Sequence, residues 1–568
     1  MSEAFDVVVI GSGAGGGPVA LTLAKAGKRV LVLERGPWLT EKDFTKDEVT
    51  VCQRSTYTPS RDLEPHVVEV PDGAGGWASQ STAGSRWDFW NGNMVGGSTN
   101  VMSGFFLRMK PIDFRLRSEF GPVEGADVVD WPITYEDLEP WYELVEREIG
   151  ISGRVVAHPR QEPRSTPEYP FPPLAEHPFA AWIDEAAPKA GLHPVPTPRA
   201  ILSKPVGKRL DCAYSGYCGS YGCPTGAKGS SRAALLGRAV ETGRCEVRPL
   251  SRARRVVTGA DGRAEGVVYV DQRTGESHRV EAKVVVVACQ AIETARLLLL
   301  STGPKHPTGL GNRSGLVGRN LLFCPDGAGL GDFPFADLSS ERAEELRSTT
   351  ETFVHRTFQD WYVIDDPKLG PSRKGGTVDF LLPHPNPITT GWGLAAWDQV
   401  EDGPIWGTAL KDRLRRWYQD GRHLRFEVFA DWLPVPDCRV TLDPQVTDRW
   451  GIPSARVRLF SHPRNREAAA WLADRGADVL RLLGARNVRT YAGNAASTNL
   501  VAGTCRFGKD PATSVLDRDC RVHDADNVYV TDGSFMPTGG SVPYTWTIYA
   551  NAFRVADRIV EALGRGAR

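Results

Sequence analysis

Runs of apolar residues near the start of the chain predict a buried βαβ unit. Val7 to Ile10 is continuously apolar, a glycine-rich turn follows at once, and a helical pattern extends from Pro18 to about Ala26. A second apolar run covers Val30 to Leu33. Because both runs lack the alternation of a half-exposed strand, they are typical of a parallel sheet covered on both faces. We therefore expect strand, turn, helix and strand over residues 5–36.

Later segments predict a second β-rich unit, an antiparallel sheet and a closing strand and helix. β-branched runs in 246–288 are followed by a helix over 292–300, and 350–460 mixes strand-like runs with Trp and Pro. The remaining expected elements are a long helix over 464–483, a strand at 528–530 and a helix over 547–563.

Two segments show no clear period. Residues 37–93 are rich in Gly, Pro and aromatic side chains, and they are longer than an ordinary loop. We expect them to be irregular and to cover a bound ligand. Residues 155–175, rich in Pro, Arg and Glu, are expected to form a linker.

The first turn carries the chemistry of a dinucleotide site. Its residues are Gly11-Ser12-Gly13-Ala14-Gly15-Gly16. Gly11 permits the tight turn, Gly13 lets backbone N–H groups approach a pyrophosphate, and Gly16 lets the helix pack closely on the strand. Glu34, at the end of the second strand, can accept hydrogen bonds from a ribose. The motif predicts a dinucleotide but leaves FAD and NAD open.

Composition narrows the class of protein. The 568 residues exceed one core and predict two or three structural units, while 41% hydrophobic and 24% charged residues are ordinary for a globular chain. A formal net charge of -1 gives no indication of a nucleic-acid or anionic-membrane partner. No apolar run approaches the roughly 20 residues that span a bilayer. The first residues lack a basic segment and a cleavage site, so we expect a cytoplasmic protein.

Taken together, ordered motifs resemble the glucose–methanol–choline (GMC) oxidoreductase family along nearly the whole chain. Beyond the first turn and Glu34, these motifs are Gly96-Gly97-Ser98-Thr99, Ala288-Cys289-Gln290-Ala291-Ile292-Glu293-Thr294, Gly318-Arg319-Asn320-Leu321, Gly503-Thr504-Cys505-Arg506, and Val530-Thr531-Asp532-Gly533-Ser534 with Pro537. The resemblance implies an α/β fold with a Rossmann-like FAD-binding domain and an inserted α+β substrate domain on an antiparallel sheet. The expected FAD-binding parts are 1–155, 241–330 and 486–568, with a cap or linker at 156–240 and the substrate domain at 331–485.

The resemblance also implies which residues bind FAD. The expected set is Gly11, Ser12, Gly13, Ala14, Gly16, Glu34, Arg35, Gly96, Gly97, Ser98, Asn100, Ala288, Asp532, Gly533 and Thr545. Some family members attach FAD through a histidine in the second glycine turn. No histidine stands between Gly96 and Met102, so we expect non-covalent FAD. The helix over 547–563 would place its positive N-terminal end near the flavin, where it favours the anionic reduced form.

The usual catalytic base is missing. Family members place a histidine three residues before the Gly503-Thr504 pair, with a second His or Asn after the Asp532 motif. Here these positions are Leu500 and Pro543, and neither accepts a proton. The expected catalytic candidates are the neighbours Asn499, Ser541 and Tyr544, and the histidines His355 and His384 of the substrate domain.

Three functions remain open for such a chain. The first is oxidation of the CH–OH group of a sugar, an aminoglycoside or a related biosynthetic intermediate, since residues 211–231 are similar to a bacterial branch that oxidises sugars, sugar acids and aminoglycosides. The second is oxidation of a C–N or activated C–H bond, and the third is flavin binding without turnover. O2 or an unidentified acceptor would reoxidise the flavin.

Cys212, Cys218 and Cys223 form the remaining cluster. In some sugar dehydrogenases of this branch, a cysteine triplet in this region binds a [3Fe–4S] cluster. The spacing differs from ferredoxin sequences and no fourth ligand is evident. A structural role as buried thiols is expected, with iron–sulfur ligation, zinc and a disulfide as the alternatives.

Overall fold

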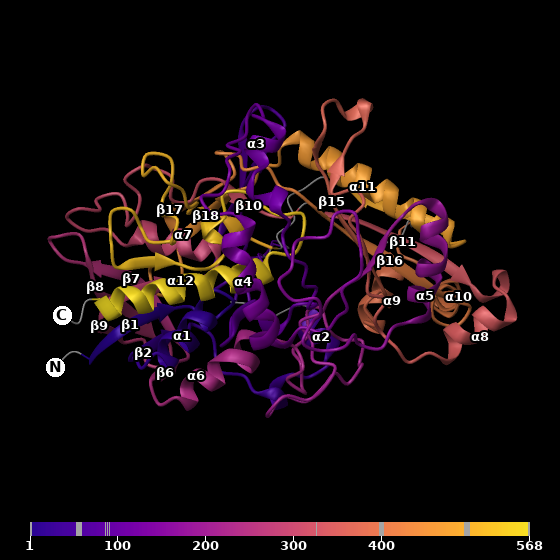
Figure 1. The fold of residues 1–568 in the computed structure, drawn as a ribbon, viewed down its shortest axis with the longest axis horizontal. Coiled ribbons are helices and arrows are strands. Elements are labelled where there is room, and N and C mark those ends of the chain that lie inside the picture. The colour runs from indigo at the N-terminus through magenta and orange to yellow at the C-terminus, as the bar shows by residue number, and fades with distance from the viewer. Residues whose placement is uncertain are drawn as a thin grey trace.

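The computed structural model describes residues 3–52, 60–85, 87, 89, 91–324, 326–396, 403–492 and 500–565. The expected βαβ unit is present at its beginning. In Figure 1, the N- and C-terminal ends lie on the same side of the molecule.

The βαβ unit belongs to a seven-stranded sheet built from segments far apart in the sequence. Its strands are β6 (Cys245–Arg248), β2 (Val30–Leu33), β1 (Glu3–Ile10), β9 (Ser277–Val287), β21 (Val528–Val530), β8 (Ala264–Asp271) and β7 (Ser251–Thr258). Strands β6, β2, β1, β9 and β21 pair in parallel, whereas β7 and β8 form an antiparallel hairpin beside the first half of β9. The expected β-rich unit of 246–288 is therefore part of the same sheet.

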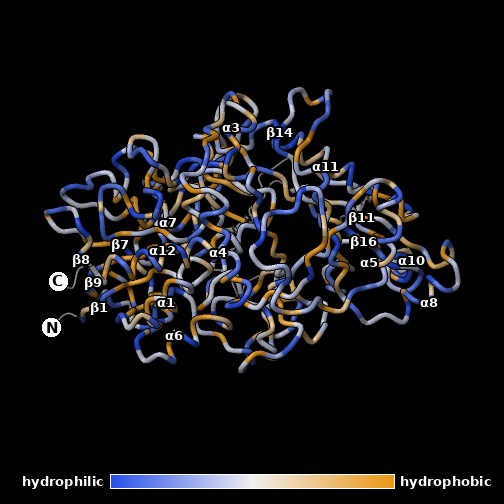
Figure 2. Tube along the Cα trace, viewed as in Figure 1, coloured by the Kyte–Doolittle hydropathy of each residue, from blue (hydrophilic) through white to orange (hydrophobic). Residues whose placement is uncertain are grey.

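Helices cover this sheet with apolar side chains. On one face, α1 (Gly16–Lys25) buries eight of its ten residues and packs against α12 (Thr545–Arg565), which also contacts α4 (Tyr135–Val145). In Figure 1, the yellow α12 and the indigo α1 lie together, although they come from opposite ends of the chain. Helix α7 (Ala291–Leu300) packs on β7. The apolar segments concentrate around β1, β9 and α1 in Figure 2, as the burial of this core requires.

The second main layer is an antiparallel sheet, as the Trp- and Pro-rich segment predicted. Its six strands, in order, are β19 (Arg486–Ala492), β11 (Asp326–Pro334), β16 (Gly421–Ala430), β15 (Gly376–Leu381), β12 (Arg356–Phe358) and β5 (Pro194–Pro196). The predicted long helix is α11 (Pro463–Leu482), which begins with a proline at its first position and packs on one face of this sheet. A separate apolar core lies between them.

Residues 37–93 are not wholly irregular. They contain α2 (Glu48–Cys52) and a hairpin of β3 (Val67–Pro71) and β4 (Trp77–Ser81). Strand β3 pairs in parallel with β18 (Pro453–Arg458), which pairs with β17 (Arg439–Thr447). The expectation of irregular structure was wrong here because these short strands find their partner almost 400 residues away, which local periodicity does not show.

The other regular elements connect these layers. They are α3 (Leu116–Phe120), α5 (Pro178–Ala186), α6 (Gly237–Glu241), α8 (Ser340–Ser348), α9 (Pro387–Ala396), α10 (Gly407–Tyr418), and the short strands β10 (Leu321–Leu322), β13 (Val363–Ile364), β14 (Arg373–Lys374) and β20 (Ala502–Gly503). Within the described residues, none of the helices combines the length and the apolar character that crossing a bilayer requires.

Candidate active site

A single cavity of about 730 Å³ connects the first glycine turn with the six-stranded sheet. Its wall includes the turn Gly11–Gly15, the start of α12 and the cavity-facing side of β16. Of the expected FAD-binding set, the following residues line it: Gly11, Ser12, Gly13, Ala14, Glu34, Arg35, Gly97, Ser98, Ala288, Asp532, Gly533 and Thr545. Gly16, Gly96 and Asn100 do not line the cavity.

Those three residues lie behind the cavity wall and support the two glycine turns. Gly16 is the first residue of α1. The backbone N–H of Gly96 donates to Ser12 Oγ over 2.8 Å, and the Asn100 amide donates to the carbonyls of Val95 and Gly97. The second glycine turn is thus fixed against the first one.

Glu34 is held in the orientation that a ribose site needs. The backbone N–H and hydroxyl of Ser12 donate to Glu34 Oε2 over 3.2 and 2.6 Å, and Gly36 N–H donates to Oε1 over 2.9 Å. Burial raises the pKa of Glu34 above its usual value. Each carboxylate oxygen keeps further acceptor capacity for a sugar hydroxyl.

Asp532 is equally constrained, and its backbone lies directly against Gly15 of the first glycine turn. Its Oδ2 accepts hydrogen bonds from Gln290 N–H and the Thr294 hydroxyl, over 2.9 and 2.5 Å, and its Oδ1 accepts from Ser534 N–H over 2.8 Å. Burial raises the pKa of this carboxyl as well. The next helix begins nearby, since Thr545 and Ile548 of α12 line the cavity. Its N-terminal dipole suits an anionic flavin ring.

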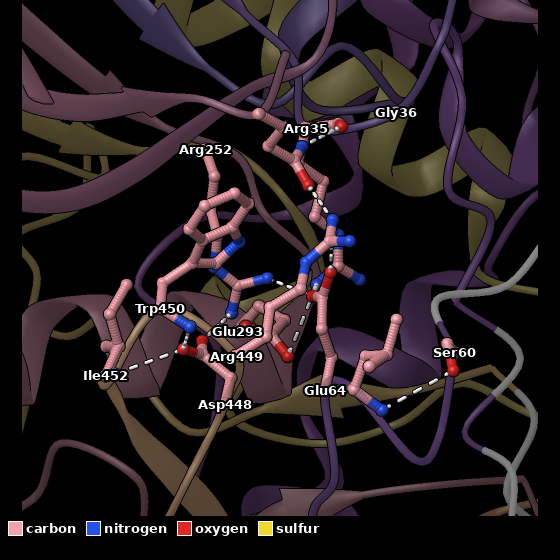
Figure 3. Close-up of polar contacts among 12 residues, drawn as sticks. Arg35, Gly36, Ser60, Glu64, Arg252, Glu293, Asp448, Arg449, Trp450 and Ile452 are labelled. Carbon is pink, nitrogen blue, oxygen red and sulfur yellow. Dashed lines mark hydrogen bonds and ion pairs between the residues drawn. The ribbon is translucent and has the colours of Figure 1, made fainter. Parts of the chain in front are cut away.

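The far end of the cofactor region is closed by an ion-pair network from five separate segments (Figure 3). Asp448, whose side chain is fully buried, accepts from Arg252 Nη2 and Arg296 Nη2, each over 2.9 Å. Arg252 also pairs with Glu64, which comes from the segment expected to cover a ligand. Arg252, Glu293, Arg296 and Arg35 line the cavity, and Arg35 Nη2 is buried without a hydrogen-bond partner among the described residues. The guanidinium groups of the arginines that line the cavity suit the phosphate and ribose oxygens of a dinucleotide.

Glu293 stays ionised inside this network. Burial would raise its pKa, but the nearby guanidinium groups of Arg296 and Arg35 hold the pKa well below its usual range. His66 adds a contact of 2.8 Å between its Nε2 and Glu293 Oε1. The sequence motif around Ala288 contained Glu293, but sequence reasoning gave no role to it or to Arg252 and Arg296.

Replacing Asp448 by asparagine should lower both the unfolding temperature and FAD retention. The change leaves two buried guanidinium groups without their shared anion, and breaking a buried ion pair costs about 3–5 kcal/mol. Differential scanning fluorimetry and flavin content after gel filtration would measure the effect. The control is Asp526→Asn, because Asp526 and its partner Arg263 are 56% and 51% exposed, and an exposed pair contributes at most about 1 kcal/mol. Equal effects of the two substitutions would contradict the role of the network.

The other end of the cavity has mostly apolar walls. Leu500 and Pro543, the two positions where a base was missing, both line it, as do Phe105, Phe429 and Tyr544. Trp546 does not line the cavity; it is buried, and its ring lies 5.8 Å from that of Phe106.

His384 is the histidine that reaches this end. It follows β15, lines the cavity, and packs against the backbone of Gly219 in the cysteine-containing loop. Burial lowers the pKa of its imidazole, and the guanidinium of Arg425 lowers it further. The ring is therefore neutral near pH 7 and has a lone pair to accept a proton.

The other expected catalytic residues lie elsewhere or are already engaged. His355 is buried outside the cavity, where its Nδ1 accepts from Arg199 Nε over 2.9 Å. Ser541 does not line the cavity and is bonded to Lys374 and the Gly375 carbonyl. Tyr544 lines it, but its hydroxyl donates to the Phe323 carbonyl over 2.7 Å. Asn499 lies outside the described residues.

The loop that packs on His384 carries the three cysteines as free thiols, so a disulfide among them is absent. The ammonium groups of Lys46 and Lys228 donate to carbonyls of this loop, and neither pairs with a carboxylate among the described residues. Burial lowers the pKa of Lys228 to about 8.

The separation of the three sulfur atoms excludes a zinc ion bound to all three. The three sulfurs do not all lie within 4.8 Å of one another, whereas two sulfurs on one zinc ion can be at most about 4.6 Å apart. Zinc therefore does not fit the loop as it stands. The half-buried Lys46 and the buried Lys228 place positive charge beside the three thiols, which suits an anionic iron–sulfur group, and iron–sulfur ligation stays a prediction beside the structural role.

Anaerobically purified protein should therefore contain iron and acid-labile sulfide, and a broad visible absorbance should underlie the flavin bands. Cys218→Ser should remove the iron, whereas Cys245→Ser, at a buried thiol on β6, should not. Iron-free protein with a normal flavin content would restore the structural interpretation.

Comparisons with known proteins agree with this site. Models described as FAD binding domain and as two parts of GMC oxidoreductase match residues 6–40, 177–325 and 434–552. The chain is 34% identical to 6'''-hydroxyparomomycin C oxidase of Streptomyces lividus, over 98% of this chain and 92% of the relative. It is 32% identical to paromamine 6'-oxidase of Streptomyces fradiae, over 98% and 91%.

The fold is likewise shared with a solved structure. A variant of formate oxidase from Aspergillus oryzae RIB40 matches with a TM-score of 0.64 and 17% identity, covering 100% of both chains. The family motifs, the cavity that runs from the first glycine turn past Asp532, and relatives more than 30% identical along their length lead to one conclusion. The chain belongs to the GMC oxidoreductase family and is an enzyme that uses FAD as its cofactor.

Proposed function

We propose that this enzyme oxidises a CH–OH group of an amino sugar or related polyhydroxylated intermediate, with His384 as the base. The observation that carries the proposal is the single cavity, which joins the dinucleotide turn to a neutral histidine. Bound FAD supplies the hydride-accepting chemistry. His384 takes the hydroxyl proton, while the apolar wall at Leu500 and Pro543 excludes water from the reacting carbon.

The substrate class rests on two relatives. The two Streptomyces enzymes are oxidases of 6'''-hydroxyparomomycin C and of paromamine, and both match almost the whole chain. The substrate end of the cavity adds Arg425 and Glu427, which can bond hydroxyl and amino groups, beside aromatic walls that suit the C–H face of a sugar ring.

The remaining parts of the proposal concern the cofactor and its reoxidation. The second glycine turn offers no histidine for attachment, so FAD is held by non-covalent contacts and acid precipitation should release all of it into the supernatant. O2 or a separate carrier reoxidises it, in a cytoplasmic biosynthetic setting.

Anaerobic titration tests the proposal. The holoenzyme is mixed with paromamine, with its 6'-deoxy analogue and with a simple amine, and flavin absorbance is followed. Bleaching by paromamine with formation of an aldehyde, and none by the deoxy analogue, would support it. Bleaching by the amine but by no alcohol would favour C–N oxidation instead. A flavin that no member of a wider alcohol and amine panel reduces would favour a non-catalytic protein.

A further inference from the structure

One face of the six-stranded sheet carries two acids side by side. Asp379 on β15 and Glu427 on β16 are direct register partners in an antiparallel pair. Glu427 lines the cavity, and so do Arg425 and Phe429, which lie two residues to either side of it on the same face. Ala328, the partner of Glu427 on β11, also lines the cavity. The acidic pair thus belongs to the cavity-facing side of the sheet.

Asp379 is the inner member of the pair. Its residue is fully buried, and Oδ1 accepts hydrogen bonds from the hydroxyls of Thr197 and Thr357 over 2.8 and 2.6 Å. Its Oδ2 has no hydrogen-bond partner among the described residues. Burial raises the pKa of Asp379 to about 7, against the lowering effects of Arg199 and the two hydroxyls. The charge of Glu427 raises the pKa of Asp379 as well.

Glu427 links this buried acid to the histidine. Its Oε1 accepts from Arg425 Nη2 over 2.6 Å, and its side chain is 31% exposed, toward the cavity. The negative charge of Glu427 also raises the pKa of His384, whereas burial, Arg425 and Lys228 lower it. Glu427 therefore acts electrostatically on both His384 and Asp379.

Two carboxylates directly opposite each other on neighbouring strands repel when both are ionised. A proton that reaches this pair relieves the repulsion. Arg425 and Arg199 each neutralise part of the charge, but neither removes it from both acids, because Arg425 pairs with Glu427 and Arg199 donates to His355 and the Ser103 carbonyl.

We propose that the Glu427–Asp379 pair receives the proton that substrate oxidation releases to His384. This inference rests on the proposed function. With FAD bound, the cofactor would accept the hydride released as the C–H bond breaks, and His384 would take the proton released as the O–H bond breaks. The imidazolium passes that proton to Glu427 and on to Asp379, which becomes a neutral carboxylic acid, and solvent later removes it. Asp379 Oδ2 has no hydrogen-bond partner among the described residues, so this oxygen is free to hold the proton.

The pH dependence of kcat is the first test. Asp379 accepts a proton only when it is ionised, so kcat of the wild-type holoenzyme should fall below about pH 7. This fall is the acidic limb of the pH profile of kcat. Asp379→Asn should remove the acidic limb and lower the maximal kcat, while KM stays unchanged. Thr357→Val removes a hydrogen bond that stabilises the ionised form, so it should shift the limb to higher pH. A purely structural role of Thr357 would not move the limb in that direction.

The matched control lies on the same sheet. Asp332→Asn on β11 removes an acid that pairs with His423 outside the cavity, and it should leave the limb in place. Glu427→Gln should lower kcat as Asp379→Asn does, because the transfer passes through it.

The second readout does not depend on turnover. Infrared spectra of flavin-free protein should show the C=O stretch of a protonated carboxyl that titrates near pH 7, and Asp379→Asn should remove it. An unchanged band or an unchanged kcat limb in Asp379→Asn would overturn the inference while alcohol oxidation stands. If no alcohol reduces the flavin of the wild type, the proposed function fails. The proton-transfer role then fails as well, even if the carboxyl C=O band titrates near pH 7.

Discussion

Replacement of His384 by alanine should slow flavin reduction by an alcohol about 10²–10⁴-fold, the usual contribution of a general base. FAD content and the unfolding temperature should change little, because the side chain faces the substrate end of the cavity and makes no contact with the glycine turns. Stopped-flow absorbance under anaerobic conditions would measure the rate constant. Added imidazole should restore part of it, since a free base can occupy the space that the side chain leaves.

Two controls make this result specific. His278→Ala changes a half-exposed histidine at the edge of β9 and should not alter the rate. Tyr544→Phe keeps the aromatic wall and removes only a hydroxyl that already donates to a backbone carbonyl. If His384→Ala retained the wild-type rate while Tyr544→Phe lost it, Tyr544 would replace His384 as the base.

Substitution of Gly13 by alanine should abolish FAD binding without unfolding the protein. A Cβ placed on Gly13 meets only the Gly96 carbonyl, at 4.0 Å, so the protein itself has room for it. That room is the space into which backbone N–H groups present themselves to the pyrophosphate. We expect the Kd for FAD to rise at least about 100-fold, which corresponds to about 2.7 kcal/mol.

Gly11→Ala provides the contrast. Gly11 has a φ of +96°, and an added Cβ would lie 2.2 Å from the Ala288 carbonyl oxygen, a backbone atom that cannot move aside. This variant should lose folded protein as well as flavin. Isothermal titration of apoprotein with FAD, together with circular dichroism, separates the two effects. A Gly13→Ala variant that binds FAD normally would show that the pyrophosphate does not approach this turn.

The cofactor site was largely predictable because its parts are short and local. The first glycine turn, the acid at the end of the next strand and the Asp-Gly-Ser motif all contribute to the lining of one cavity, and each is visible within a few residues of sequence. Glu34 and Asp532 both line the cavity as expected. Asn100 and Gly96 were assigned to the cofactor itself, but they support the turn from behind, a difference that only side-chain direction can show.

The substrate end was harder because it depends on which face of a distant sheet meets the cofactor. The alternation along β16 was present in the sequence, with Arg425, Glu427 and Phe429 between apolar neighbours. No neighbouring residue in the sequence indicated that this face of β16 points into the cavity. For the same reason, His355 and His384 were indistinguishable in the sequence, although only the second lines the cavity. The ion pairs of Asp448 and Glu64 with Arg252 join segments nearly 200 residues apart, so they could not be foreseen.

The pairing of β21 with β9 and the packing of α12 on α1 determine when, during synthesis, the FAD site is complete. The strand at 528–530 and the residues Asp532 and Thr545 are synthesised about 500 residues after the first glycine turn, yet they complete the same sheet and cavity. A nascent chain that ends before residue 528 would expose the edge of β9 and the apolar face of α1. The FAD site is therefore complete only once the segment from β21 to α12 has been synthesised.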